Sequence, residues 1–200
     1  MFEKGKQVDI VRLNIPGMHN ILNSLGVIAL LRTFGLEYSQ FLKFLPDFKG
    51  VGRRMEVKLN RQCLLIIDDY AHHPTEIKAT VQALKGLGKK VTVVFQPHRF
   101  SRTAHLVHDF GSAFEHAERV LLTDIYSAGE PNPNQIQASV IYDAIKKTGH
   151  PEVSILPRDK IVDFLLSHHE TEQTVAFLGA GDIGEVADEF ASRFESVYSH

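Results

Sequence analysis

The feature that most constrains the fold is an alternation, from Cys63 onward, of short apolar runs with segments of helical spacing. The runs occupy residues 63–70, 90–97, 119–126, 153–157 and 174–180 and are nearly continuously apolar and rich in Val, Ile, Leu or Phe. Such runs are typical of strands buried on both faces of a parallel sheet. Helical spacing of apolar residues follows them at 75–87, 104–116, 140–145, 161–165 and 183–198. The alternation predicts an α/β domain with a doubly wound, mainly parallel, Rossmann-like sheet.

The first fifty residues have a different pattern. Residues 6–17 are predicted to form an edge strand or hairpin that ends in a turn at Pro16-Gly17, and two helices are predicted at 19–34 and 38–45. The Pro- and Gly-containing stretch 46–52 is a plausible hinge. Because this segment offers little core of its own, we predict two domains: 1–52 as the tail of a larger domain and 53–200 as a second domain.

Composition excludes several classes of protein. Hydrophobic residues make up 44% and charged residues 23% of the chain, which is ordinary globular composition. The formal net charge of −2 gives no basic field for nucleic acid or an anionic membrane. The single cysteine, Cys63, excludes an internal disulfide and a cysteine metal cluster and favours a reduced compartment. With no signal-peptide core and no run of about 20 apolar residues, we expect a cytoplasmic protein.

Polar side chains gather where the predicted strands end. The four segments are 68–74 (DDYAHHP), 96–103 (QPHRFSRT), 124–130 (DIYSAGE) and 179–182 (GAGD). In an open α/β sheet the ligand crevice lies outside the carboxyl ends of the strands, where helix amino termini also favour anions. Carboxylates, imidazoles and guanidinium groups are therefore expected to meet at one rim of the sheet.

Each of these residues also has an ordinary structural explanation. Asp69 could simply end a strand, and His72 or His73 alone is more often a structural hydrogen-bonding group than a base. Arg99 and Arg102 precede the predicted helix, where they are either solvated or suited to a bidentate carboxylate or phosphate. The pair His168-His169 lies in a polar stretch and is predicted to be on the surface, away from the rim.

Two further motifs leave alternatives open. Residues 179–184 (GAGDIG) match a dinucleotide-binding pattern, but the chain ends before the second strand and acidic residue that the pattern requires. The remaining interpretation of this motif is a tight turn whose amides could hold an anion. Asn20 and Asn23 share a helix face, and with His19 they could contact a purine, although capping explains one of them equally well. Arg53-Arg54 could bind phosphate or form an ordinary charged strand edge.

At these residues the chain resembles the Mur ligase superfamily. The matching motifs are PGMHNILN (16–23), FKGVGRRME (48–56), DDYAHHPTEI (68–77), VFQPHRFSRT (94–103), DIYSAGE (124–130) and GAGDIG (179–184). The resemblance implies an ATP-dependent ligase of peptidoglycan synthesis that joins L-alanine to UDP-N-acetylmuramate through an acyl phosphate. It also implies that 1–52 end the central ATP-binding domain and that 53–200 form the carboxyl-terminal domain.

The resemblance assigns cofactor roles to five residues. His19, Asn20 and Asn23 would contact adenine, Arg54 the phosphates and Asp69 the ribose of ATP. Most ligands of the accompanying Mg2+ would belong to a central-domain portion that this sequence lacks, because no G-x-x-x-x-G-K-[ST] occurs in it. We therefore expect the chain to be inactive without the missing amino-terminal and central domains.

The resemblance assigns the amino-acid site to the loops of the rim. Tyr70, His72, His98 and Arg102 would shape the site, with Arg102 on the alanine carboxylate. Arg99 would stabilise charge on the acyl phosphate or tetrahedral intermediate, and His72 or His98 would help to deprotonate the alanine ammonium. The alternatives are another muropeptide ligase and a non-catalytic α/β module that binds an anion.

Overall fold

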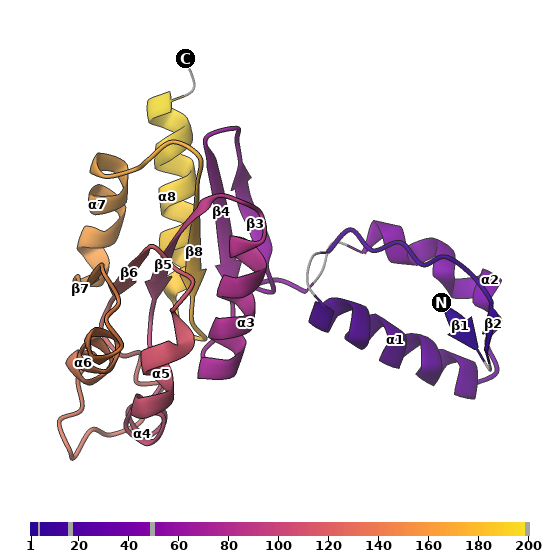
Figure 1. Ribbon diagram of the computed structural model, residues 1–200, viewed down its shortest axis with the longest axis horizontal. Coiled ribbons are helices and arrows are strands. Elements are labelled where there is room, and N and C mark those ends of the chain that lie inside the picture. The colour runs from indigo at the N-terminus through magenta and orange to yellow at the C-terminus, as the bar shows by residue number, and fades with distance from the viewer. Residues whose placement is uncertain (4, 16–17, 49–50, 199–200) are drawn as a thin grey trace. The chain divides into compact units, whose positions relative to one another are not determined.

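The computed structural model describes residues 1–3, 5–15, 18–48 and 51–198, and the chain divides into two compact units, Met1–Val51 and Gly52–His200. The boundary predicted from the sequence lay between residues 52 and 53. The predicted turn at Pro16-Gly17 and residues 49–50 of the predicted hinge lie outside the described residues. Figure 1 shows the elements of each unit, and the two units are described separately below.

Unit 2 is built on a six-stranded sheet of order β3-β4-β8-β5-β6-β7 (Figure 1). Its strands are β3 (Glu56–Asn60), β4 (Leu64–Asp69), β5 (Lys90–Phe95), β6 (Arg119–Leu122), β7 (Val153–Ile155) and β8 (Gln173–Leu178). Strand β3 pairs antiparallel with β4, and the other neighbouring strands pair in parallel. The predicted mainly parallel sheet is thus confirmed.

Helices cover both faces of this sheet. They are α3 (Pro74–Lys85), α4 (Phe100–His105), α5 (Val107–Ala113), α6 (Ser139–Lys147), the short 3-10 helix η2 (Arg158–Lys160), α7 (Ile161–Ser167) and α8 (Ile183–Tyr198). Apolar residues of α3, α5 and α6 form one core with the sheet, and those of α7 and α8 form a second core on the other face. All residues of β4 and β8 are buried, because both faces of these strands are covered.

Two details of unit 2 differ from the prediction. The predicted helix at 104–116 is two helices, α4 and α5, which meet at Leu106, where φ is −105° and the first helix ends. Arg102 therefore lies inside α4 and does not precede the helix. Strand β3 was not predicted, because its single buried residue, Leu59, stands among charged and polar residues and gives too short an alternation.

Unit 1 contains a small hairpin and helices. The hairpin pairs β1 (Phe2–Glu3) with β2 (Lys6–Gln7), and the helices are α1 (Met18–Thr33), α2 (Tyr38–Phe41) and the 3-10 helix η1 (Leu42–Asp47). The predicted helix at 19–34 agrees closely with α1. The predicted helix at 38–45 is divided between α2 and η1, and η1 contains Pro46.

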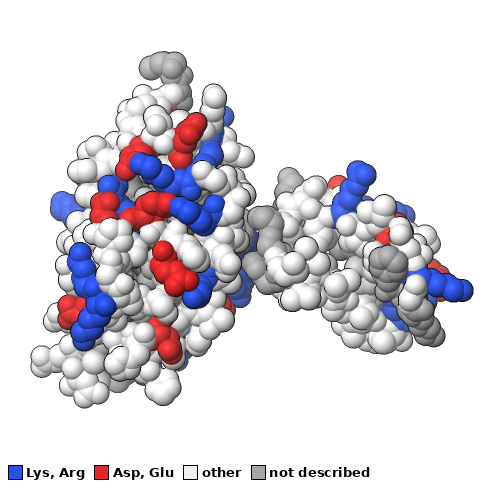
Figure 2. Space-filling view, viewed as in Figure 1, with Lys and Arg blue, Asp and Glu red and all other residues white. Residues whose placement is uncertain are grey.

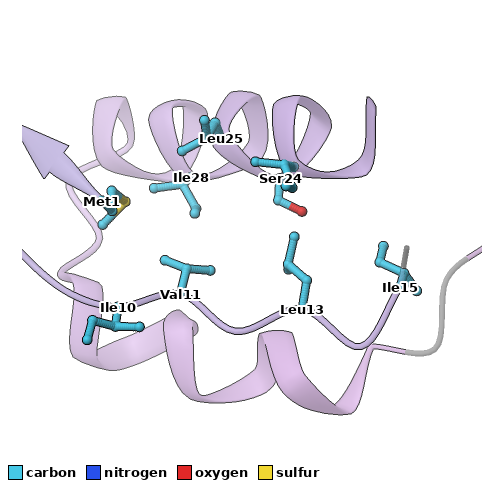
Figure 3. A pocket seen from close by; sticks show the side chains of 9 residues that line it. Met1, Ile10, Val11, Leu13, Ile15, Ser24, Leu25 and Ile28 are labelled. Carbon is cyan, nitrogen blue, oxygen red and sulfur yellow. The ribbon is translucent and has the colours of Figure 1, made fainter. Parts of the chain in front are cut away.

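Helix α1 leaves much apolar surface uncovered. Ile28 is buried, but many large apolar side chains of the helix are exposed: Met18, Ile21, Leu22, Leu25, Val27 and Leu30. Val11 and Leu13 point toward Ser24 and Ile28 across a pocket of about 590 Å3 (Figure 3). A helix with apolar residues around most of its circumference is typical of the interior of a larger domain.

Charges of both signs are mixed over the face of unit 2 that Figure 2 shows. Exposed charged side chains of unit 2 form surface ion pairs, such as Arg193 with Asp163 and Arg61 with Glu195. Among the helices of the described residues, none combines the length and the apolar character needed to cross a membrane.

Candidate functional site

The register of the sheet brings the ends of four strands to one level. Asp69 of β4 pairs with Leu178 of β8, Leu178 pairs with Phe95 of β5, and Phe95 pairs with Leu122 of β6. These four residues form one row across the sheet, and the loops that follow them leave the sheet at the same edge. We call this edge, with loops 70–73, 96–99, 123–130 and 179–182, the rim.

The centre of the rim is a cluster of aromatic and imidazole rings. The His72 and His98 ring centroids are 5.9 Å apart, and Tyr70 meets His72 edge-on at 5.4 Å. His98 stacks on Tyr126, with centroids 5.6 Å apart and planes 15° apart. Arg102 Nη1 lies 3.1 Å from His98 Nδ1. Four of the predicted residues, Tyr70, His72, His98 and Arg102, are therefore neighbours.

Tyr126 is a member of this cluster to which the sequence analysis assigned no role. An isolated parallel bridge joins His98 to Tyr126, and the Tyr126 amide donates to the Pro97 carbonyl at 2.8 Å. The Arg99 amide in turn donates to the Tyr126 carbonyl at 2.8 Å. The β5 and β6 loops are thus held together by backbone hydrogen bonds, which fix the stacking of the two rings.

The position of α4 depends on the strained backbone of Arg99 and on the carboxylate of Glu130, which is distant in sequence. Arg99, directly before the helix, has φ of 72°, a conformation that is uncommon for a residue with a side chain. The Ser101 amide donates to Glu130 Oε2 at 3.0 Å. Hydrogen bonds from Ser101 hold the pKa of Glu130 below its usual value. Glu130 therefore fastens the helix that carries Arg102, while Arg99 remains exposed.

The environment of His98 disfavours its charged form. Burial lowers the pKa of His98, and the positive charges of Arg102 and Arg99, with that of His72 in its protonated form, lower it further, against the opposing effect of Glu130. An arginine guanidinium can only donate hydrogen bonds. The contact with Arg102 therefore requires an unprotonated Nδ1 on His98, which agrees with a neutral ring.

His73 and Glu76 build the start of α3 and so position His72. His73 is the N-cap residue, and its Nδ1 accepts from the Thr75 amide at 3.3 Å. Glu76 Oε2 accepts from the His72 and His73 amides at 3.1 and 3.2 Å. Burial raises the pKa of Glu76, but these two donors outweigh it and the pKa is lowered. The structural explanation thus applies to His73, while His72 faces the cluster.

Arg53 lies outside the loops of the rim but is extensively hydrogen-bonded to them, although the sequence analysis favoured Arg54. Its Nε lies 3.1 Å from Asp68 Oδ2, and its Nη1 and Nη2 donate to the Gly181 and Gly179 carbonyls, each at 2.6 Å. Its own carbonyl accepts from the Tyr70 amide at 2.7 Å. Arg53 thus joins the start of unit 2, the end of β4 and the turn after β8. The spacing of residues in the sequence does not indicate that Arg53 joins these segments.

Arg54 and Asp69, the cofactor residues expected in unit 2, have different surroundings. Arg54 is exposed, with its guanidinium 5.5 Å from the centroid of the Tyr70 ring. Asp69 is 4% exposed, and its Oδ1 and Oδ2 accept from the Ala71 and Met55 amides, both at 2.8 Å. Both oxygens therefore stabilise the local backbone, a structural role that competes with the predicted contact to a ribose.

The glycine turn after β8 is closely packed. A Cβ on Gly181 would lie 2.3 Å from Gln96 Oε1 and 2.6 Å from Tyr126 Cγ, and a Cβ on Gly184 would lie 2.7 Å from Asp68 Oδ2. Gln96 Nε2 donates to Asp182 Oδ1 at 2.7 Å. The glycines thus allow the turn to approach neighbouring loops, and anion binding by its amides stays a prediction.

The cofactor residues expected in unit 1 are less well defined. Asn20 is buried and Asn23 is exposed on α1, and the side chain of His19 lies outside the described residues. Neither Asn20 nor Asn23 is among the described residues that line the pocket of unit 1, and those residues are apolar apart from Ser24. In the described part of the chain, no group of three or more His, Cys, Asp or Glu side chains could hold a metal ion. The described residues therefore do not fit a Mg2+ site of their own.

The pair His168-His169 follows α7 at the opposite, amino-terminal edge of the sheet. His168 is exposed and stacks on Phe164 at 4.2 Å, and His169 packs edge-on against Phe194 and Tyr198. The prediction that this pair lies away from the rim is confirmed.

Comparisons with known proteins show which family this chain is similar to. Residues 53–181 match the family model described as Mur ligase, glutamate ligase domain. The chain is 39% identical over 97% of its length to a UDP-N-acetylmuramate–L-alanine ligase of Geotalea daltonii and 40% identical over 97% to one of Microcystis aeruginosa. It covers only 43% and 42% of those two proteins.

Solved structures show the same similarity. The crystal structure of a UDP-N-acetylmuramate–alanine ligase from Thermotoga maritima superposes with a TM-score of 0.81 at 30% identity, covering 98% of this chain and 42% of that one. A murein peptide ligase from Psychrobacter arcticus, at 22% identity and a TM-score of 0.64 over 91% of this chain and 38% of that one, shares the fold.

Proposed function

This chain belongs to the Mur ligase family through its glutamate ligase domain, and we propose that it is the carboxyl-terminal part of an ATP-dependent ligase that joins L-alanine to UDP-N-acetylmuramate. Unit 2 would be the carboxyl-terminal domain, and unit 1 the end of the central ATP-binding domain. The reaction would be a step of peptidoglycan synthesis in the cytoplasm, where ATP is available.

The observation that carries this proposal is the cluster formed by Tyr70, His72, His98 and Arg102 at the rim. A small amino acid offers a carboxylate and an ammonium group, and the cluster offers a guanidinium for the first and imidazoles for the second. The likeness to ligases that act on L-alanine supports the same substrate.

Several residues of this chain are proposed to contact ATP. Arg54 is the exposed cation proposed for the phosphates, with Arg99 near the developing charge of the acyl phosphate. Asn20, Asn23 and His19 are proposed for the adenine, and Asp69 for the ribose. ATP with Mg2+ would supply the phosphoryl group that activates the muramate carboxylate, and most metal ligands would come from sequence outside this chain.

The test is a chimera in which this chain replaces the aligned 196-residue segment of the Geotalea daltonii ligase. We expect phosphate release from ATP that requires both UDP-N-acetylmuramate and L-alanine, and no release by this chain alone. Release that requires a peptide and not L-alanine would identify another muropeptide ligase. Absence of release, together with retained binding of inorganic phosphate, would favour a non-catalytic anion-binding module.

A further inference from the structure

The two imidazoles of the rim have opposite kinds of hydrogen-bonding partner. His72 Nδ1 lies 3.0 Å from the Tyr70 carbonyl oxygen and 3.7 Å from Glu76 Oε2. Both atoms can only accept a hydrogen bond, since a carbonyl oxygen and an ionised carboxylate have no proton to give. Nδ1 of His72 must therefore carry the proton, and in the neutral ring the lone pair is on Nε2.

His98 is in the opposite situation. Its Nδ1 lies 3.1 Å from Arg102 Nη1, and a guanidinium is always protonated and donates only. Nδ1 of His98 must therefore be the acceptor, which leaves the proton of the neutral ring on Nε2. Stacking on Tyr126 fixes the plane of this ring. The two tautomers follow from the neighbours of each ring.

We propose that His72 and His98 are held in opposite tautomers, so that His72 presents a basic Nε2 and His98 presents an Nε2–H donor to the amino-acid site. The tautomers follow from the contacts of this chain, and the division of roles rests on the proposed ligase function. In that reaction, Nε2 of His72 takes a proton from the alanine ammonium, and the freed amine attacks the carbonyl carbon of the acyl phosphate. The C–N bond forms as the C–O bond to the phosphate breaks, and inorganic phosphate leaves with the electron pair and with the second proton that the nitrogen loses. His98 donates a hydrogen bond and takes up no proton.

The charged groups that face the two rings are consistent with this division. Glu76 lies beside His72, with its Oε2 3.7 Å from Nδ1, and it accepts from the His72 amide at the start of α3. Arg102 and Arg99 act on His98 from α4 and its preceding residue, and Glu130 acts in the opposite sense from the β6 loop. A negative partner thus accompanies the proposed base, and positive partners accompany the proposed donor.

The tautomers can be measured by long-range 1H–15N correlation spectra of the whole 15N-labelled chain at pH ~8, above the usual imidazole pKa of about 6.5. Loss of signals in His72→Gln and His98→Gln assigns the two rings. We expect the proton on Nδ1 of His72 and on Nε2 of His98. A proton on Nε2 of His72 or on Nδ1 of His98 would overturn the proposal, whether or not the ligase is active.

Two arginine variants distinguish the effect of the Arg102 hydrogen bond on the His98 tautomer from the effect of a nearby positive charge. Arg102→Met should move His98 toward a mixture of tautomers and leave His72 unchanged. Arg99→Met removes the same charge from the residue directly before α4 and should leave both tautomers unchanged. If the tautomer of His98 persists in Arg102→Met, the proposed cause is wrong.

The roles are tested in the active chimera. Gln keeps an N–H donor but is no base, so His98→Gln should retain more activity than His98→Leu. His72→Gln should lose about 10²–10⁴-fold in kcat, as much as His72→Leu. Rescue by Gln at position 72, or equal loss with Gln and Leu at position 98, would overturn the roles. An unsubstituted chimera without L-alanine-dependent activity would instead contradict the proposed function.

Discussion

The guanidinium of Arg53 lies 3.1 Å from the carboxylate of Asp68, a side chain that is only 1% exposed. Burial raises the pKa of Asp68, and the charge of Arg53 and its hydrogen bond partly oppose this effect. The pair joins the first residues of unit 2 to the end of β4, at the base of the rim. Removing either partner should therefore disturb both stability and the site.

Arg53→Met should lower the free energy of unfolding of unit 2 by about 3 kcal/mol at pH 7, because it leaves a buried carboxylate without its cation. The double variant Arg53→Met with Asp68→Asn should recover part of this loss, since the amide has no charge to compensate. Urea denaturation of the whole chain measures both. Equal stability of the single and double variants would contradict this explanation.

The loss of stability caused by Arg53→Met should depend on pH. Because the pKa of Asp68 in the folded state is raised above 3.8, the folded state binds this proton more tightly than the unfolded chain does. The unfavourable contribution of ionised Asp68 therefore disappears as the pH falls through the raised pKa. The loss of stability in Arg53→Met should be smaller at pH ~4 than at pH 7, and a larger loss at pH ~4 would contradict the assignment.

Gly181→Ala should destabilise unit 2 by about 1–3 kcal/mol through overpacking. Its Cβ would meet both Gln96 and the Tyr126 ring, and movement of the ring would also change the resonances of His98. Gly86→Ala is a suitable control, because Gly86 has φ of −61° and its Cβ would meet only backbone oxygens at 3.3 Å or more. The control should change stability by less than about 1 kcal/mol.

Glu76→Ala should cost about 1 kcal/mol of stability, because the His72 and His73 amides lose their acceptor at the start of α3. Glu76→Gln should cost less, since glutamine also completes a capping box. The folded pKa of Glu76 is below 4.5, so the contribution of its carboxylate is present above about 4.5 and is lost as the pH falls through the lowered value. Thermal denaturation of the unchanged chain and of both variants at pH 7 and pH ~3 measures the cost of each substitution and its dependence on pH.

His98 should titrate in NMR spectra below the usual value of about 6.5, and Arg102→Met should raise its pKa because it removes a positive charge. Since the unfolded chain takes up this proton first, the contribution of His98 makes the folded state less stable as the pH falls below about 6.5. A pKa of His98 at or above the usual value in the unchanged chain would contradict the structure of the cluster.

Much of the architecture could be predicted from the sequence, because strands buried on both faces leave a strong apolar signal. Strands β4, β5, β6 and β8 have this signal, whereas β3 buries one side chain among charged residues and was missed. The break at Leu106 was missed for a related reason, since helical spacing continues through both α4 and α5 and does not reveal a change of direction.

For the site, the sequence predicted which loops meet at one edge of the sheet but not the contacts that individual side chains make there. The order of strands and helices brought His72, His98 and Arg102 to one edge, which the rings and contacts of the rim confirm. The roles of Arg53 and Tyr126 depend on backbone geometry, such as the φ of 57° at Arg53 and the bridge between His98 and Tyr126. No spacing in the sequence predicts such contacts.

The most direct test of the central claim is the KM for L-alanine in the chimeric ligase with Arg102→Met, compared with Arg193→Met on the distant surface of α8. If the rim binds the amino acid through its carboxylate, Arg102→Met should raise the KM at least about 30-fold, or ~2 kcal/mol, and Arg193→Met should leave it unchanged. An unchanged KM in Arg102→Met would show that L-alanine does not bind at this rim.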